Sequence, residues 1–135
     1  MFLIKAKLQN QEFKTNKNLY DYITNYFVQN KLNKAFPIGI SVNNIIAHDS
    51  YHPKHIITFK MGDYIKVDFG MEEDGNIIDS ARTFEYGNPE ESLSIRECRE
   101  IVQSIEKYIK KELLLNEKIL IQKISLLTNL EINVR

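Results

Sequence analysis

The stretch KVDFGMEEDGNIIDSARTF, residues 66–84, decides the fold of this chain. Two runs with the character of β-strands flank Asp74-Gly75, and an Asp-Gly pair in that position is a strong signal for a hairpin. Each predicted strand carries one aspartate among apolar neighbours, Asp68 in the first and Asp79 in the second. Aspartate is depleted from strands. The presence of two aspartates in one predicted hairpin therefore needs an explanation.

The length of the hairpin loop sets how the two aspartates are paired. A two-residue turn at Asp74-Gly75 places Asp79 opposite Gly70, whereas a four-residue loop over 72–75 places Asp79 opposite Asp68. Because side chains alternate between the faces of a strand, both registers put the two carboxylates on one face. Two close carboxylates repel, and one becomes protonated unless a cation lies between them. Carboxylate oxygens suit Mn²⁺, Fe²⁺, Co²⁺ or Zn²⁺.

A simpler interpretation is that both aspartates face solvent, because antiparallel sheets often leave one face wet. The neighbours argue against it. Val67, Phe69, Ile77 and Ile78 are apolar, so each aspartate interrupts an apolar strand and is not part of a polar stripe.

The rest of the chain predicts an α+β domain with an antiparallel sheet and flanking helices. Helical spacing of Leu19, Ile23 and Phe27 predicts a helix over residues 17–32, with Asn16 or Asn18 as its cap. The other expected elements are a strand at 38–42, a turn at 43–44, a short apolar segment at 45–48, a loop at 49–60, strands at 64–69 and 76–84, and helices at 90–114 and 116–130.

Composition indicates one soluble globular domain, residues 1–135, because 43% of the residues are hydrophobic and 27% are charged. Eighteen basic residues balance eighteen acidic ones, which gives no electrostatic reason to expect DNA or a membrane as a partner. Cys98 is the single cysteine, so no internal disulfide forms. No segment resembles a secretory signal or a transmembrane span, and we expect a cytoplasmic protein.

The three histidines, His48, His52 and His55, all fall within eight residues. His48 follows the apolar segment Ile45–Ala47 and is expected to end a buried strand. His52 and His55 are expected to be solvated in the loop, since the intervening Pro53 argues against a helical pair that binds metal.

Three blocks resemble methionine aminopeptidases, the type 2 branch in particular. Residues 35–48, AFPIGISVNNIIAH, are similar to the AFPxGxSxNxxAAH segment of that family. Residues 62–70, GDYIKVDFG, resemble its GDxxKxDFG strand, and residues 74–81 resemble its GxIxDxA strand. The order of the blocks agrees, and the resemblance covers about residues 16–130. Arg82-Thr83-Phe84 is closer to the type 1 branch.

The resemblance implies the N-terminal half of a pita-bread fold, the creatinase/aminopeptidase-like architecture of two pseudo-symmetric halves around a two-metal site. It implies that Asp68 chelates one divalent metal ion (Mn, Co, Fe or Zn), that Asp79 bridges two, and that His48 contacts and helps polarise the scissile peptide. Phe36 would line the pocket for the methionine side chain. The family removes N-terminal methionine from nascent proteins, and a metal-bound hydroxide attacks the carbonyl.

The family completes its site with one more histidine and two glutamates from its C-terminal half, and no histidine follows His55 here. We therefore expect a partial chain that binds metal weakly and is inactive alone. A homodimer or a complementary C-terminal half could complete the site, with a peptide or nascent-protein N-terminus as the substrate.

Two other interpretations remain open from the sequence. One is a catalytically inactive pita-bread relative that binds RNA, ribosomes or protein, similar to the proliferation-associated proteins, although Asp79 argues against it because those proteins typically lose the second aspartate. The other is an unrelated small α+β interaction module.

Overall fold

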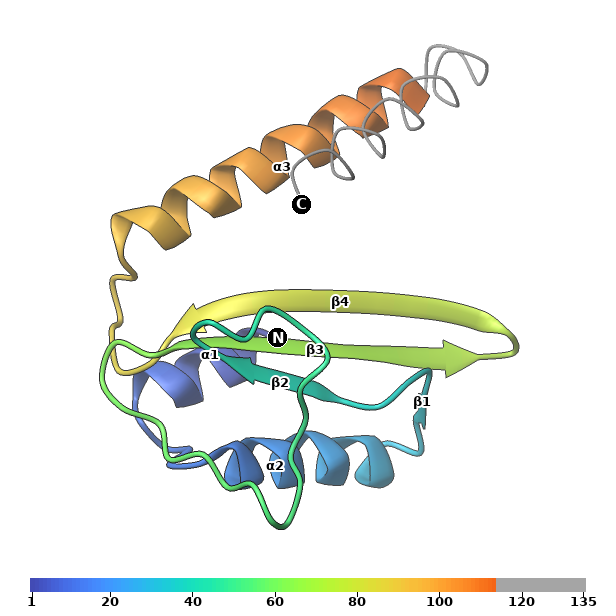
Figure 1. Ribbon diagram of the computed structural model, residues 1–135. Helices are drawn as coiled ribbons and strands as arrows, with labels where there is room; N and C mark the ends of the chain where they lie inside the picture. The colour runs from blue at the N-terminus through green and yellow to red at the C-terminus, as the bar shows by residue number, and fades with distance from the viewer. Residues whose placement is uncertain (114–135) are drawn as a thin grey trace. The chain divides into compact units, whose positions relative to one another are not determined.

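A four-stranded antiparallel sheet, built around the predicted hairpin, organises the first part of the chain (Figure 1). β3 (Tyr64–Glu73) pairs with β4 (Asn76–Glu85) along its whole length. On its other edge, β3 pairs first with β2 (Gly39–Val42) and then with β1 (Asn33–Lys34). The sheet with its helices confirms the predicted α+β class.

The computed structural model describes residues 1–113, so the predicted helix at 116–130 lies outside the described residues. The chain divides into two units, residues 1–95 and 96–135, and each is described by itself. The sheet, α1 and α2 all belong to the first unit.

The hairpin closes with a two-residue turn. Asp74 and Gly75 have φ angles of 52° and 80°, the left-handed values at both central positions that a type I′ turn requires. Gly70 therefore pairs with Asp79, and Asp68 pairs with Ala81. Of the two registers that the sequence leaves open, the structure selects the shorter loop.

Two helices cover one face of the sheet (Figure 1). α2 (Asn16–Gln29) buries Leu19, Ile23 and Phe27, which lie four residues apart on one side of the helix and confirm the predicted apolar face. α1 (Phe2–Gln9) was not expected, because it begins at the second residue and has no side-chain cap to signal it.

Thr15, and neither Asn16 nor Asn18, caps α2. The Thr15 hydroxyl accepts a hydrogen bond from the Asn18 amide at 3.2 Å, and the Asn18 side chain accepts one from the Thr15 amide at 3.1 Å. This reciprocal pair is a capping box, with asparagine in the place that glutamate or glutamine usually takes. The sequence prediction missed it because Asn18 acts as the third helical residue.

Thr15→Ala is expected to destabilise the fold by about 1 kcal/mol, because it leaves an amide at the start of α2 without its acceptor. Thr15→Ser keeps the hydroxyl and serves as the control. Urea denaturation followed by circular dichroism measures the difference. Equal midpoints for the alanine and serine variants would show that the hydroxyl does not stabilise the helix.

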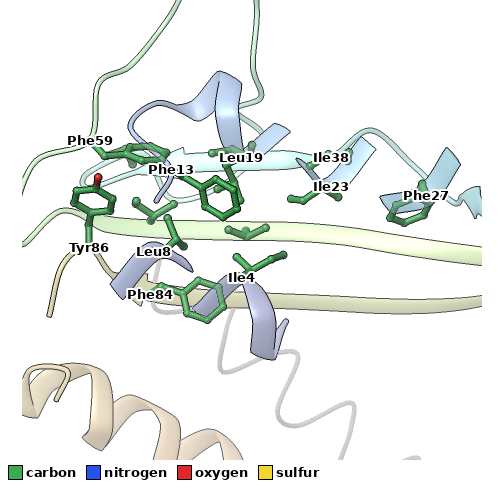
Figure 2. Close-up of a cluster of buried hydrophobic side chains, with 14 residues drawn as sticks. Ile4, Leu8, Phe13, Leu19, Ile23, Phe27, Ile38, Phe59, Phe84 and Tyr86 are labelled. Carbon is green, nitrogen blue, oxygen red and sulfur yellow. The ribbon is translucent and has the colours of Figure 1, made fainter. Parts of the chain in front are cut away.

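The hydrophobic core lies between the two helices and the sheet. Figure 2 shows Phe84 of β4 beside Ile4 and Leu8 of α1, with Phe27 near the far end of the cluster. The members that are at most 7% exposed include the following residues: Ile4, Leu8, Phe13, Leu19, Ile23, Phe27, Ile38, Ile40, Val42, Phe59, Ile65, Val67, Phe84 and Tyr86. Because Ile65 and Val67 point into this core, Asp68 points to the opposite face of β3.

One expectation about apolar residues was wrong. Residues 45–48 form no strand and their side chains are exposed, so His48 does not end a buried strand. Ile77 and Ile78 are 61% and 65% exposed. They lie near the turn of the hairpin, which extends beyond the helices that cover the rest of the sheet (Figure 1). An apolar side chain at residues 45–48, 77 or 78 is therefore not a sign that the residue is buried.

α3 (Leu93–Leu113) matches the helix predicted over 90–114, and Lys110 and Lys111 lie in its last turn, where cations suit the helix dipole. Among the helices of residues 1–113, none has both the length and the apolar composition that crossing a membrane requires.

Candidate metal centre

The candidate site lies on the face of the sheet that α1 and α2 leave uncovered. Strand register and side-chain alternation place one set of residues on this face, which we call the aspartate face. Its members near the hairpin's centre are Gly39 and Ser41 of β2, Lys66, Asp68 and Gly70 of β3, and Asp79, Ala81 and Thr83 of β4.

Asp68 and Asp79 are diagonal neighbours on this face, since Asp79 pairs with Gly70, two residues beyond Asp68. The shared face that the parity argument predicts is confirmed. Burial raises the pKa of the Asp68 carboxyl above its usual range, and the Asp79 carboxylate raises it further through its charge and a shared hydrogen bond. The two groups are therefore close enough to compete for one proton.

The chemistry of the pair fits a divalent cation. Asp68 Oδ1 is buried and has no hydrogen-bond partner, and neither aspartate forms a salt bridge with a described residue. A buried carboxylate oxygen without a partner is costly unless a cation or a donor reaches it. Within residues 1–113, however, no three His, Cys, Asp or Glu side chains gather as a metal site. The described residues bring two carboxylates together, and no third side chain of these kinds joins them.

Lys66 is the lysine nearest in sequence to Asp68 on the aspartate face, but its ammonium group hydrogen-bonds to a different residue. Its Nζ donates a hydrogen bond to the Asn43 carbonyl at 2.6 Å. Asn43 itself bridges β2 to the start of β3, because its side chain donates to Asp63 and accepts from the Tyr64 amide. This arrangement leaves the Asp68 carboxylate available to another cation. Sequence analysis assigned no role to Lys66 or Asn43.

His48 reaches the same site from the loop after β2. The electrostatic influence of His48 acts against the rise in the pKa of Asp68. The residue has a φ of 64°, in the left-handed region, and its side chain is exposed. The imidazole is thus near Asp68 and open to a ligand, although it is not at the end of a strand. His52 and His55 are exposed, as expected, and bridge to each other through their backbones.

Phe36 is brought to the aspartate face by an outward bend between β1 and β2. Lys34 pairs with Met71 and Gly39 pairs with Asp68, so residues 35–38 lie opposite only two residues of β3. The extra length lets the Phe36 ring fold over Gly70. Since Gly70 pairs with Asp79, the ring lies beside the second aspartate. Two strands and two loops therefore bring Asp68, Asp79, Phe36 and His48 to the same region of the sheet.

The raised pKa of Asp68 gives a testable pH dependence. Asp79→Asn removes the neighbouring charge, so the pKa of Asp68 in the metal-free protein should fall toward its usual value. When the pKa of a group is higher in the folded state than in the unfolded state, the folded state holds more protons between the two pKa values. The free energy of unfolding therefore falls as the pH rises through this range. That decrease should be smaller in the variant. Carbon-13 NMR titration of the Asp68 carboxyl measures its pKa in the wild type and in the variant, and Asp74→Asn at the hairpin turn is the control. An unchanged Asp68 titration in Asp79→Asn would contradict the proximity.

Comparison with known sequences supports the motifs. The sequence model of metallopeptidase family M24 matches residues 3–117. Methionine aminopeptidase from Thermococcus onnurineus is 39% identical over 83 residues, which are 62% of this chain and 28% of that protein. The Pyrococcus abyssi enzyme is 40% identical over 70 residues, 52% of this chain and 23% of that protein. Methionine aminopeptidase 2 from Ajellomyces capsulatus is 44% identical over 61 residues, 44% of this chain and 13% of that protein.

This chain thus spans little more than a quarter, or less, of the length of these relatives. The family is one of metal-dependent peptidases with the pita-bread fold, and the sheet with its helices agrees with part of that fold. The family match covers most of the sequence and contains all four gathered residues. The chain belongs to metallopeptidase family M24.

Proposed function

We propose that this chain provides the two-aspartate part of a methionine aminopeptidase site, which removes N-terminal methionine from peptides or nascent proteins. The observation that carries the proposal is the pair itself. Asp68 and Asp79 share the face of the sheet opposite α1 and α2, and Asp68 keeps a buried carboxylate oxygen without a partner. The similarity to named methionine aminopeptidases supports the same substrate class.

Each gathered residue has a role in this proposal. Asp68 and Asp79 would hold divalent metal, for which Mn²⁺, Co²⁺, Fe²⁺ and Zn²⁺ are the candidates with suitable ligand chemistry. Bound metal polarises a carbonyl and lowers the pKa of water. The exposed His48 imidazole would hydrogen-bond to the substrate's scissile peptide, and Phe36 would contact the first side chain.

The remaining ligands are proposed to come from outside the described residues. A complementary C-terminal half or a second copy of this chain would bring them to the aspartate face. The single cysteine agrees with a cytoplasmic setting for this assembly.

The test supplies a Met-Ala-Ser peptide to the full 135-residue chain in Mn²⁺ and measures free methionine by mass spectrometry. It is run with the chain alone and with the part of the Thermococcus onnurineus enzyme that the chain does not match. The expected result is methionine release in the mixture, and none when the chain carries Asp79→Asn. Tight association without any release would favour the inactive, binding-protein interpretation.

A further inference from the structure

The Gly70 position carries a feature that neither the metal site nor the family match explains. A Cβ atom built on Gly70 would lie 2.5 Å from Phe36 Cε1, 3.0 Å from Phe36 Cζ and 3.2 Å from Ala35 Cβ. Non-bonded carbon atoms rest about 3.5–4.0 Å apart. The Phe36 ring therefore lies directly on the backbone of β3, in space that any other residue at position 70 would fill.

The contact is built by the backbone on both sides. The Ala35 amide donates a hydrogen bond to the Gly70 carbonyl at 3.0 Å, so the segment before Phe36 is tied to the same residue. Beyond Phe36, Ile38 enters the core and β2 resumes at Gly39. Phe36 is thus anchored on either side, and its ring is directed to the position opposite Asp79.

Glycine inside a strand weakens the strand, and it often marks a place where another group approaches closely. Gly70 is not needed for a left-handed backbone, since its φ lies outside that region, whereas Gly62, Gly75 and Gly87 have φ angles of 71–83°. The absence of a side chain, and not backbone freedom, is what position 70 requires.

From these contacts we propose that Gly70 is a positioning residue that sets the size of the substrate side-chain pocket. It lets the Phe36 ring approach the backbone of β3 at the position that pairs with Asp79, and the substrate's first side chain would pack on the exposed side of that ring. This rests on the proposed function, in which Phe36 contacts the first side chain of the substrate. A larger residue at position 70 would lift the ring into the space of that side chain and favour small side chains.

The chain should tolerate Gly70→Ala. The nearest atoms to the new methyl group are the far end of the Phe36 side chain, which can rotate away, so the ring should move by about 1 Å. A misplacement of about 1 Å can cost about two orders of magnitude in catalytic rate, so a shift of the ring by this amount is large enough to matter for the site.

The experiment compares binding of L-methionine and L-alanine to the Mn²⁺-saturated chain by NMR titration. Gly70→Ala is expected to lower the preference for methionine over alanine by about tenfold or more, a typical effect of changing a pocket by one methyl group. Mn²⁺ affinity should stay close to that of the wild type, because Asp68 and Asp79 are unchanged. Gly75→Asn is the matched control, since nothing lies within 4 Å of a Cβ at Gly75 and asparagine tolerates its left-handed backbone.

A second variant tests whether the effect passes through the ring. Phe36→Leu removes the two ring atoms that meet the new methyl group, so Gly70→Ala should change the preference little in a Phe36→Leu background. This is a double-mutant cycle with a large expected coupling. If the effects of Gly70→Ala and Phe36→Leu on the preference for methionine over alanine are additive, the proposed role of Gly70 is overturned.

The experiment distinguishes a failure of the proposed function from a failure of the inference about Gly70. A wild-type chain that binds Mn²⁺ but does not prefer methionine to alanine overturns the proposed function and this inference together. A wild-type preference that survives Gly70→Ala overturns the inference about Gly70 and leaves the proposed function standing.

Discussion

Asp79→Asn and Asp68→Asn are each expected to lower the affinity of the chain for Mn²⁺ by about tenfold or more, since even the loss of a residue that only supports a metal ligand costs 10–100-fold. The reason is that no third His, Cys, Asp or Glu of the described residues joins this pair as a possible metal site, so each aspartate would supply a large share of the binding energy. Isothermal titration calorimetry measures the affinities. Asp74→Asn changes an aspartate of the same hairpin that lies at the turn, and it should bind Mn²⁺ as the wild type does.

The same variants separate a metal ligand from a structural residue. Without metal, Asp79→Asn should leave the fold at least as stable as the wild type, because it removes the charge that helps to raise the pKa of Asp68. With saturating Mn²⁺ the wild type should become the more stable protein, since a ligand that binds only the folded state stabilises it. Destabilisation of Asp79→Asn by the same amount in both conditions would mean that the aspartate supports the fold and does not bind metal.

Phe84→Ala should destabilise the first unit by about 3–5 kcal/mol, the usual cost of removing a buried phenylalanine ring. Phe84 is 2% exposed and packs among Ile4 and Leu8 of α1 (Figure 2), so the substitution leaves a cavity where β4 meets the helix. Because small domains are stable by only about 5–15 kcal/mol, the loss is a large fraction of the total. Urea denaturation of the 135-residue chain, followed by far-ultraviolet circular dichroism, measures it.

Ile78→Ala is the matched control in the same strand. Ile78 is 65% exposed, and its truncation should change the free energy of unfolding by less than about 0.5 kcal/mol. A similar large loss in both variants would place Ile78 in a buried contact and contradict the exposed end of the hairpin.

Much of the fold was predictable because its signals are local. Helical spacing identified α2 and α3, and the Asp-Gly pair identified the hairpin. The misses have local causes too. α1 lacks a side-chain cap, and the cap of α2 is Thr15 with Asn18, a pairing that departs from the usual glutamate. The buried strand expected before His48 was predicted wrongly, because an apolar side chain is buried only where another element covers it.

The sequence also predicted some features of the candidate site and left others undetermined. That Asp68 and Asp79 share a face follows from the sequence, since alternation along a strand is a property of the extended backbone. The register is decided by the left-handed φ angles of Asp74 and Gly75, which choose the two-residue turn. The sequence therefore predicted the pair and left its exact partners open.

The kind of site can be predicted from the amino-acid sequence alone: two carboxylates on one strand pair, within motifs of a metallopeptidase family. The surroundings of that pair depend on the three-dimensional fold. His48 comes near Asp68 from an exposed loop, and Phe36 lies on Gly70 because residues 35–38 bend out between two paired strands. These contacts join residues twenty or more positions apart in the sequence, so they depend on how strands pair and loops close, and no local pattern encodes that geometry.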